Sequence, residues 1–460
     1  MKKVLKSFIL VVLCLCTCLT FAGCGKVKWS EVTTNTEGVL SNGGIVLTST
    51  NDGWLYFING LKTNSEVNNE KSNVQAGIYR VKTDDKGQII YKENTAKASD
   101  KDKEETKEFS QVERVVDHIV GYEEGSVYVF GNYIYYATPC KDVNDEGEML
   151  INKTEIRRYD IKNKASQKLY TTKQSEDTIT YGYYVQNNAL YLVIYEKNVE
   201  SLTSVKLGKS AKTVFVKNGV KSAILSEVAN SNKFAEKSVF YTITDPDNGT
   251  IVKRILPDGT GETQLSKDKE VELLHVKGDF LIYSLNDNIY HKKVDAYTEE
   301  LPTEEANVIC HENYEHIVFD VEKEGQTYVN ALVYKDTTII YLGWENGECV
   351  TYDIIKRFNE GEKVEFIGVE GDWVVYKHQS TICKSQFKNV TDSDNKKPVE
   401  LSSTKFDEAK ELMAPEVMNG YVYGFVTDSS TSTTYLYRIS LETPENPAEL
   451  PKAEFIGVKE

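Results

Sequence analysis

Two histidines in the stretch HENYEH are the residues of this chain that come nearest to a metal-binding pattern. His311 and His316 are five residues apart. Zinc-binding helices space their histidines by four, in the pattern H-E-x-x-H, so that both rings lie on one face. A spacing of five does not achieve this, and the flanking residues have strand character. The sequence therefore predicts no metal site here, and we find no motif for any other cofactor.

A second polar stretch, DPDNG at residues 245–249, begins like a calcium-binding loop. Asp245 and Asp247 alternate before Gly249. The position that would supply the bidentate glutamate of such a loop is Leu256, which has no oxygen ligand in its side chain. We expect a tight hairpin turn instead, because Asp, Asn and Gly tolerate the backbone angles that short turns need.

Catalytic motifs are not evident in the chain. It contains no G-x-S-x-G nucleophile elbow, no P-loop and no dinucleotide-binding glycine pattern. A pair of carboxylates for glycoside cleavage stays open, because acidic residues are frequent and such a pair would have to meet across separate parts of the chain. We name no catalytic residue. We expect a binding protein rather than an enzyme, with a glycoside hydrolase or a polysaccharide lyase as the alternative.

One tryptophan stands outside the repeating pattern that is described below. Trp344 lies in YLGWENGE beside a predicted turn, whereas Trp54 and Trp373 both directly follow a pair of Gly and Asp. An exposed Trp next to a turn would stack on a sugar ring or on a partner protein. Trp344 is therefore the ligand-contact aromatic that the sequence suggests, and packing between repeats is the alternative.

The N-terminus has the layout of a secretory signal. Three lysines precede the apolar run FILVVLCLCTCLTF at residues 8–21, which is short for a membrane span. The next residues, FAGC, resemble the lipobox of bacterial lipoproteins. This resemblance implies cleavage after Gly23 and a lipid on the sulfur of Cys24, so that the chain is anchored to a membrane without spanning it. A plain signal peptide or an uncleaved anchor is the alternative.

The expected layout of the chain follows from this signal. We expect a lipoprotein signal peptide at residues 1–23, the lipidated cysteine with a short tether at residues 24–40, and a single folded domain at residues 41–460. Lys strongly outnumbers Arg, and Lys, Asn, Ile and Tyr are abundant together, which is typical of AT-rich genomes. We therefore expect an extracytoplasmic protein anchored to the membrane at a Gram-positive cell surface.

The formal net charge of the chain is −16, and removal of the signal lysines would make it more negative. Nucleic-acid binding depends on the neutralisation of phosphates by Lys and Arg, so this composition argues against a nucleic-acid partner. An anionic lipid surface would also repel such a chain as a whole. Solubility in a crowded extracellular layer is the interpretation that we prefer.

Four cysteines remain beyond the signal and Cys24, and they lie far apart in the sequence. They are Cys140, Cys310, Cys349 and Cys383. No C-x-x-C pair occurs among them, so neither a zinc ribbon nor a redox motif is supported. Export permits disulfides, but the sequence does not choose among the three pairings that four cysteines allow. We expect mainly buried thiols, with one disulfide as the alternative.

Short strand-like runs recur along residues 41–460. Each run starts with a polar turn and continues with residues rich in Tyr, Val and Ile. The runs lie at residues 52–60, 131–139, 187–196, 237–245, 278–286, 314–322, 371–379 and 419–427. Their mean spacing of about 52 residues fits a four-stranded unit of ~40–50 residues with loop insertions. The pattern predicts an all-β chain folded as a single closed β-propeller, with eight blades expected and seven as the alternative.

Hairpins that follow several of these runs carry a family resemblance. IYRVKTDDKGQIIY at residues 78–91 and RILPDGTGETQLS at residues 254–266 each place Asp and Gly in the turn between two strands. They resemble the outer hairpins of TolB-type β-propeller repeats. The resemblance extends loosely over residues 40–460 and implies the propeller fold of a surface lipoprotein, but no activity, because propellers have many unrelated functions. A β-sandwich array or a β-helix is the alternative fold.

These observations favour a non-catalytic binding or scaffold module. A propeller presents loop ends and a central channel to its surroundings, and both suit the binding of an envelope protein or a glycan. A propeller-type glycoside hydrolase or polysaccharide lyase is one alternative. An accessory lipoprotein of a transport or secretion system is another.

The end of the chain indicates how the ring would close. Ala453–Val458 reads as a strand without a local partner, and it repeats the letters FIGV of residues 366–369. An open ring would leave two unpaired sheet edges, which promote aggregation. We therefore expect this strand to pair with the first blade or the last, near residues 45–49 or 27–32.

Deletion of residues 452–460 should unfold the protein or cause it to aggregate, because the deletion would remove the closing strand. Thermal unfolding and light scattering of the truncated chain measure this directly. Melting behaviour equal to that of the full chain would contradict ring closure by this tail.

Overall fold

The computed structural model describes most of the strand-forming part of the chain. The described residues are 28–35, 39–41, 46–49, 52–59, 77–92, 108–117, 127–140, 153–174, 178–225, 228–229, 237–247, 249–268, 271–277, 279–294, 298, 301–304, 307–310, 316–320, 330–335, 338–345, 348–357, 359, 361–362, 364–379, 381–386, 399–400, 412–428, 433–443 and 454–456.

The described strands group into eight sheets of four or five strands. Neighbours are antiparallel, except that β15 lies parallel to β10. The first four sheets comprise β1 (Val39–Ser41), β2 (Val46–Ser49), β3 (Trp54–Asn59), β4 (Gly77–Lys82) and β5 (Val112–Val116); β6 (Tyr128–Phe130), β7 (Tyr133–Pro139), β8 (Thr154–Asp160) and β9 (Ala165–Thr171); β10 (Ile179–Gln186), β11 (Ala189–Glu196), β12 (Ser201–Leu207), β13 (Lys212–Asn218) and β15 (Val228–Ala229); and β14 (Val220–Ile224), β16 (Val239–Asp245), β17 (Gly249–Ile255) and β18 (Thr263–Asp268).

The last four sheets each have four strands. They comprise β19 (Glu272–Lys277), β20 (Phe280–Leu285), β21 (Asn288–Lys293) and β22 (Val308–Cys310); β23 (His316–Asp320), β24 (Asn330–Lys335), β25 (Thr338–Glu345) and β26 (Glu348–Arg357); β27 (Val364–Glu370), β28 (Trp373–His378), β29 (Thr381–Gln386) and β30 (Val399–Glu400); and β31 (Leu412–Met418), β32 (Tyr421–Asp428), β33 (Thr433–Ser440) and β34 (Glu454–Phe455).

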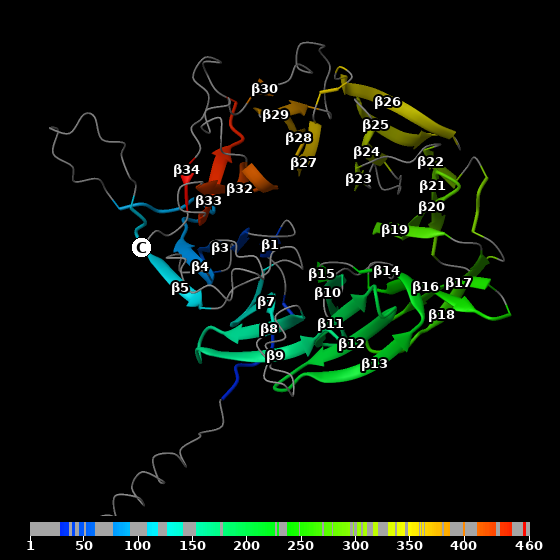
Figure 1. Ribbon diagram of the computed structural model, residues 1–460, viewed down its shortest axis with the longest axis horizontal. Coiled ribbons are helices and arrows are strands. Elements are labelled where there is room, and N and C mark those ends of the chain that lie inside the picture. The colour runs from blue at the N-terminus through cyan, green and yellow to red at the C-terminus, as the bar shows by residue number, and fades with distance from the viewer. Residues whose placement is uncertain are drawn as a thin grey trace, which may run out of the picture.

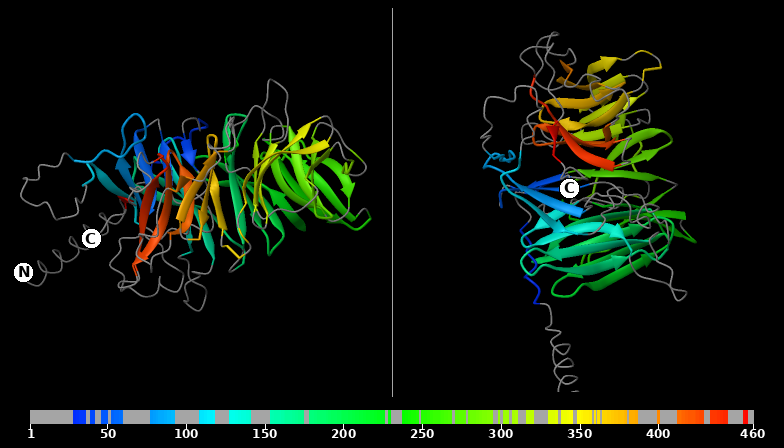
Figure 2. Two further views of the ribbon diagram at one scale, coloured as in Figure 1. Left: turned by 90° about the horizontal axis from the view of Figure 1, so that it is seen from above. Right: turned by 60° about the vertical axis from the view of Figure 1, so that its left-hand side comes forward.

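The sheets follow one another around a ring in chain order (Figure 1). The first strand of a sheet, such as β19 or β23, lies towards the middle, and the last, such as β18 or β26, lies towards the rim. Seen from the side, the strands run across the thickness of the disc (Figure 2). This is the arrangement of a β-propeller, so the prediction of an all-β propeller is confirmed. Within the described ranges, no helix has the length and apolar character needed to cross a membrane.

The strand-like runs seen in the sequence fall one in each sheet. Most are second strands, as β20 and β28 are, whereas the run at residues 314–322 contains the inner strand β23. Inner strands such as β27, VEFIGVE, mix apolar residues with Glu and Gly, so they stand out less in composition. The repeat unit was therefore located correctly, but its first strand was missed.

The stretch DPDNG forms the predicted hairpin turn. Asp245 ends β16 and pairs with Gly249, the first residue of β17. The backbone N–H of Asp247 donates to the Asp245 carboxylate at 3.0 Å, and Gly249 has a φ of +73°. Glycine suits this position because it adopts positive φ without steric cost.

The C-terminal strand does not close the ring as expected. Phe455 of β34 pairs with Tyr437 of β33, so the tail completes a sheet that is built wholly from C-terminal residues. The strand was expected to pair with the first blade or the last, and it pairs with the last. The positions named for that pairing, near residues 45–49 or 27–32, are wrong. The return to β33 spans a short stretch of chain, and the entropy cost of closing a loop grows with its length.

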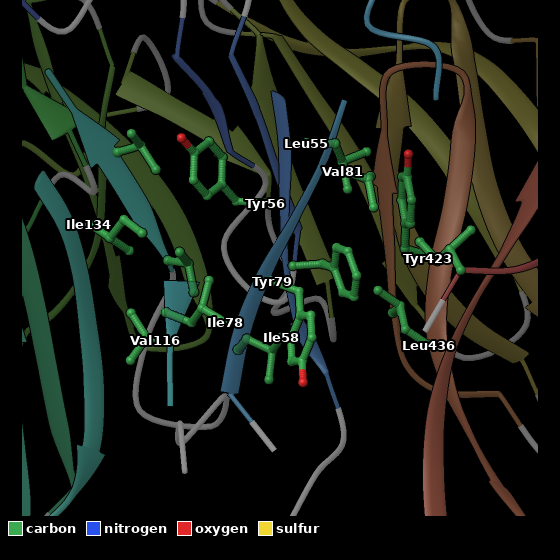
Figure 3. Close-up of a cluster of buried hydrophobic side chains, with 14 of the residues drawn as sticks. Leu55, Tyr56, Ile58, Ile78, Tyr79, Val81, Val116, Ile134, Tyr423 and Leu436 are labelled. Carbon is green, nitrogen blue, oxygen red and sulfur yellow. The ribbon is translucent and has the colours of Figure 1, made fainter. Parts of the chain in front are cut away.

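Side-chain packing joins the last sheet to the first instead. One buried cluster includes Leu55 and Ile78 of the first sheet and Tyr423 and Leu436 of the last, as Figure 3 shows. Ile456, directly after β34, belongs to the same cluster and is 0% exposed. The burial of apolar surface is the main favourable term in such packing. The tail thus contributes to closure through a side chain rather than through a shared strand.

A polar network covers the outside of this junction. The Glu454 carboxylate of β34 accepts hydrogen bonds from the Tyr91 hydroxyl at 2.5 Å and from Arg438 Nε at 2.7 Å. The Arg438 guanidinium lies 4.1 Å from the centre of the Tyr421 ring, and the Tyr421 hydroxyl donates to Gln88 Oε1 at 2.7 Å. The segment that follows β4, at residues 88–91, is thereby held against the last sheet.

Replacement of Ile456 by Ala should lower the free energy of unfolding by about 2–5 kcal/mol, because it leaves a cavity in the closing cluster. Chemical denaturation of the purified protein measures this value. Val216→Ala is the matched control, since Val216 is 45% exposed and a change there should cost under about 0.5 kcal/mol. Equal stability of the two variants would show that Ile456 does not hold the junction.

Candidate functional site

A pocket lies between the seventh and eighth sheets, beside a turn of the first sheet. Its cavity volume is about 280 Å³. The lining residues are Gln88, Glu370, Trp373, Lys384, Gly420, Tyr421, Ser440, Leu441 and Glu442. The pocket therefore sits at the junction where the end of the chain meets its beginning.

Strand ends place these side chains on one face of the ring. Glu370 and Trp373 bracket the turn between β27 and β28, and Met418 and Tyr421 bracket the turn between β31 and β32. Each sheet repeats the same strand order from the middle outwards, so these inner turns lie on one face. We call it the hairpin face, and it also carries the turn at residues 131–132 between β6 and β7.

Glu370 is one of the two acidic residues that line the pocket. Its Oε1 accepts a hydrogen bond from the Gly420 N–H at 2.6 Å. Its Oε2 is buried and has no hydrogen-bond partner among the described residues. Burial raises the pKa of this carboxyl above its ordinary value, and the Gly420 bond and the charge of Lys384 oppose that rise. One carboxylate oxygen is thus available to a ligand that donates a hydrogen bond.

Lys384 is the basic group of the pocket and is 5% exposed. Its ammonium donates to the Leu441 carbonyl at 2.5 Å and lies 4.2 Å from the centre of the Trp373 ring. Burial lowers the pKa of the amine, while the charges of Glu370 and Glu442 act in the opposite direction. The amine is therefore held by fixed partners on the wall of the pocket.

Trp373 and Tyr421 supply apolar surface beside these charges. Both are half-buried first residues of their strands, β28 and β32. Small-ligand sites combine apolar and aromatic walls with a few fixed polar groups. This pocket has that composition, with two carboxylates, an ammonium, an amide, a serine hydroxyl and two aromatic rings.

The residues singled out in the sequence lie elsewhere. Cys24 and His311 are outside the described residues, and His316 begins β23. Trp344 lies in β25 opposite Cys349, and its side chain is outside the described part. Contact of Trp344 with a ligand stays a prediction.

Sequence reasoning assigned Trp373 to packing within the repeat and missed the pocket. Trp54 does hold the equivalent place at the start of β3, with the Arg80 guanidinium 4.2 Å from its ring centre. Trp373 differs because Glu370 and Tyr421 come close to it from two other strands. Only the turn pairs GD and NG next to these residues were visible in the sequence.

No group of three or more His, Cys, Asp or Glu side chains that could hold a metal ion occurs among the described residues. The thiols of Cys140, Cys310 and Cys383 are buried, and the Cys140 thiol donates to the Glu155 carboxylate at 3.4 Å. The side chain of Cys349 is outside the described part.

Some solved structures resemble this chain at low sequence identity. No family model and no curated protein matches the chain. A puromycin-hydrolyzing peptidase of Mycobacterium tuberculosis is 10% identical, with 72% of this chain and 52% of that chain covered and a TM-score of 0.41. This chain therefore spans about half the length of that peptidase.

Two further solved structures are propeller domains. The β-propeller domain of the Trilobed protease from Pyrococcus furiosus, described as having an open velcro topology, is 10% identical; 70% of this chain and 96% of that chain are covered, with a TM-score of 0.36. The WD40 domain of SCAP from fission yeast is 9% identical; 68% and 82% are covered, with a TM-score of 0.39. Likenesses this distant carry no argument about function.

Replacement of Glu370 by Gln should change how stability depends on pH. The folded-state pKa of Glu370 lies above its ordinary value of 4.5, so above pH ~4 the folded protein binds more protons than the unfolded chain until the group ionises. Wild-type stability therefore falls as pH rises through this window, and Gln cannot ionise. Melting temperatures should shift in favour of Glu370→Gln between about pH 4 and pH 7. If the melting temperatures of Glu370→Gln and the wild type differed by the same amount at every pH in this range, the raised pKa would be contradicted.

Proposed function

We propose that this chain is a membrane-anchored extracytoplasmic lipoprotein whose β-propeller binds a glycan of the cell envelope without cleaving it. Each of the eight sheets is one blade, and the repeats belong with those of TolB-type propellers. The lipid sits on Cys24 after removal of residues 1–23, and the protein lies at a Gram-positive cell surface. The sequence of the N-terminus supports the anchor, and the pocket supports the ligand.

The pocket between the seventh and eighth sheets carries the argument for a glycan. A sugar ring has an apolar face that packs on aromatic side chains and hydroxyls that need hydrogen-bond acceptors. Trp373 and Tyr421 provide the aromatic surface. Oε2 of Glu370, which has no hydrogen-bond partner among the described residues, provides an acceptor. A cavity of about 280 Å³ suits one or two sugar units rather than a protein interface, which buries roughly 800 Å² on each partner.

A second candidate, a glycoside hydrolase, has one observation in its favour. Glu442 lines the same pocket as Glu370. The charges of both carboxylates act to raise the pKa of Lys384. Two carboxylates are the groups that glycoside cleavage needs, one of them with a raised pKa for the acid role. Incubation of the protein with the bound polysaccharide, followed by an assay for new reducing ends, separates the two functions. Product formation that disappears in Glu370→Gln would favour the enzyme.

Replacement of Trp373 by Ala should weaken glycan binding by about tenfold or more, as removal of a central aromatic contact does in other interfaces. Isothermal titration of residues 25–460 with purified cell-wall polysaccharide measures this change. Trp54→Ala is the matched control, because Trp54 holds the equivalent strand position outside the pocket. Equal losses in the two variants, or no binding by the wild type, would refute the pocket as a glycan site.

A further inference from the structure

The N-terminal segment at residues 28–35 is packed against the second sheet. The Asp160 carboxylate at the end of β8 accepts hydrogen bonds from the Ser30 N–H at 2.7 Å and from the Ser30 hydroxyl at 3.0 Å. The Tyr133 hydroxyl donates to the Ser30 carbonyl at 2.6 Å. Figure 2 shows this segment in dark blue beside the teal strands of the second sheet. It is thus part of the folded body, although the sequence placed it in a tether.

Apolar and cationic contacts hold the same segment. Trp29 and Val32 pack against a buried cluster of the second and third sheets. The fully buried Arg158 guanidinium lies 5.8 Å from the Trp29 ring centre. The Thr33 methyl lies so near Gly131 that a Cβ there would meet it at 2.9 Å. These contacts fix the direction in which the chain leaves the ring.

Asp160 contributes no accessible negative charge at this place. The Asn163 N–H and side-chain amide donate to its carboxylate in addition to Ser30. Burial by itself would raise its pKa, but the hydrogen bonds from Asn163 and Ser30 outweigh burial and lower the pKa below its usual value. The carboxylate is therefore fully occupied within the fold.

Exposed lysines surround the point where the segment is docked. Lys162 and Lys164 flank Asn163, whose side chain also donates to the Ser30 hydroxyl at 3.1 Å. Lys209 follows β12, and its carbonyl accepts a hydrogen bond from Arg158 at 3.2 Å. Lys28 itself is exposed, as is the single acidic residue of the segment, Glu31. The local charge is thus positive on a chain whose net charge is −16.

The lipid anchor would lie close to this basic surface. Cys24 lies four positions before Lys28, and an extended chain covers at most about 3.6 Å per residue. The sulfur of Cys24 thus stays within roughly 14 Å of Lys28. A tether this short cannot let the ring turn freely.

We propose that the docked segment holds the propeller with its hairpin face against the membrane, and that Lys28, Lys162, Lys164 and Lys209 contact anionic lipid headgroups there. This inference rests on the proposed lipid anchor. The turns that carry Lys162, Lys164 and Lys209 lie on the hairpin face, because they join the third and fourth strands at the end where the first two strands are also joined. A lysine near an anionic bilayer contributes about 1 kcal/mol of attraction.

The orientation restricts the ligand of the pocket. Glu370 and Trp373 lie on the same hairpin face, at the turn between β27 and β28. The pocket then faces the membrane, so the glycan that it binds is one that reaches the bilayer surface, as a lipid-linked glycan does. A free polysaccharide in the outer wall would have to enter beneath the disc.

Lysine labelling tests the orientation on the full-length protein. The protein, purified from its own membrane, is reconstituted into vesicles of phosphatidylcholine and phosphatidylglycerol and treated with an amine-reactive reagent. Mass spectrometry gives the labelling rate at each lysine, with detergent micelles as reference. Lys162, Lys164 and Lys209 should be labelled about fivefold more slowly on vesicles, the ratio that corresponds to the attraction per lysine. Lys173 and Lys197, exposed at the opposite ends of β9 and β11, should keep their rates.

Two variants and one mass measurement complete the test. Asp160→Ala and Trp29→Ala each release the segment, so the slowing should disappear in both while the anchor remains. Equal labelling of all five lysines on wild-type vesicles would overturn the orientation. The mass of the N-terminal peptide shows separately whether Cys24 carries a lipid. A peptide without lipid would overturn the proposed anchor itself, and with it the membrane-facing surface.

Discussion

The packing of the last sheet against the first is the interaction on which the ring depends. The two sheets share no strand, and no backbone hydrogen bond joins them within the described part of the chain. The junction relies on apolar burial around Leu55, Tyr423 and Ile456. The Arg438 guanidinium is 4% exposed; burial disfavours its charge, but Tyr423, Glu454 and Tyr91 around it raise its pKa. Such a group is stable only while its partners stay in place. Apolar contacts and this fixed charge therefore close the ring together.

The pocket follows from the same junction. Tyr421 lines the cavity, and its hydroxyl also donates to Gln88 of the first sheet. One residue thus belongs both to the wall of the pocket and to the contact that closes the ring. Glu370 is kept in a partly desolvated position where ionisation is unfavourable. Ionisable groups whose surroundings disfavour the charged form are common at binding and catalytic sites, because the stability of the fold around them offsets the unfavourable free energy. This coupling links the proposed ligand to the stability of the whole ring.

Lysines gather around the docked N-terminal segment of a chain that is acidic as a whole. Its overall acidity favours solubility and opposes contact with an anionic bilayer. The lysines around the docked N-terminal segment reverse that effect locally, and the segment itself limits how far the ring can move from Cys24. Short-range attraction by a few lysines acts within a Debye length of about 8 Å, whereas the remaining charge is screened by salt at larger distances. The lysines around the docked segment therefore dominate the proposed contact with anionic headgroups.

The sequence by itself determined the strand content, the repeat spacing and the turn at residues 245–249, whereas the anchor at Cys24 stays a prediction. These features depend on residues near one another in the chain, where side-chain periodicity and turn preferences act directly. Only the tertiary structure decided the rest. Trp373 looked equivalent to Trp54 until Glu370 and Tyr421 were brought beside it from neighbouring strands, and Ser30 gave no sign of its bonds to Asp160. Contacts between residues so far apart in the chain leave no periodic signal, because the folding of the whole ring creates them.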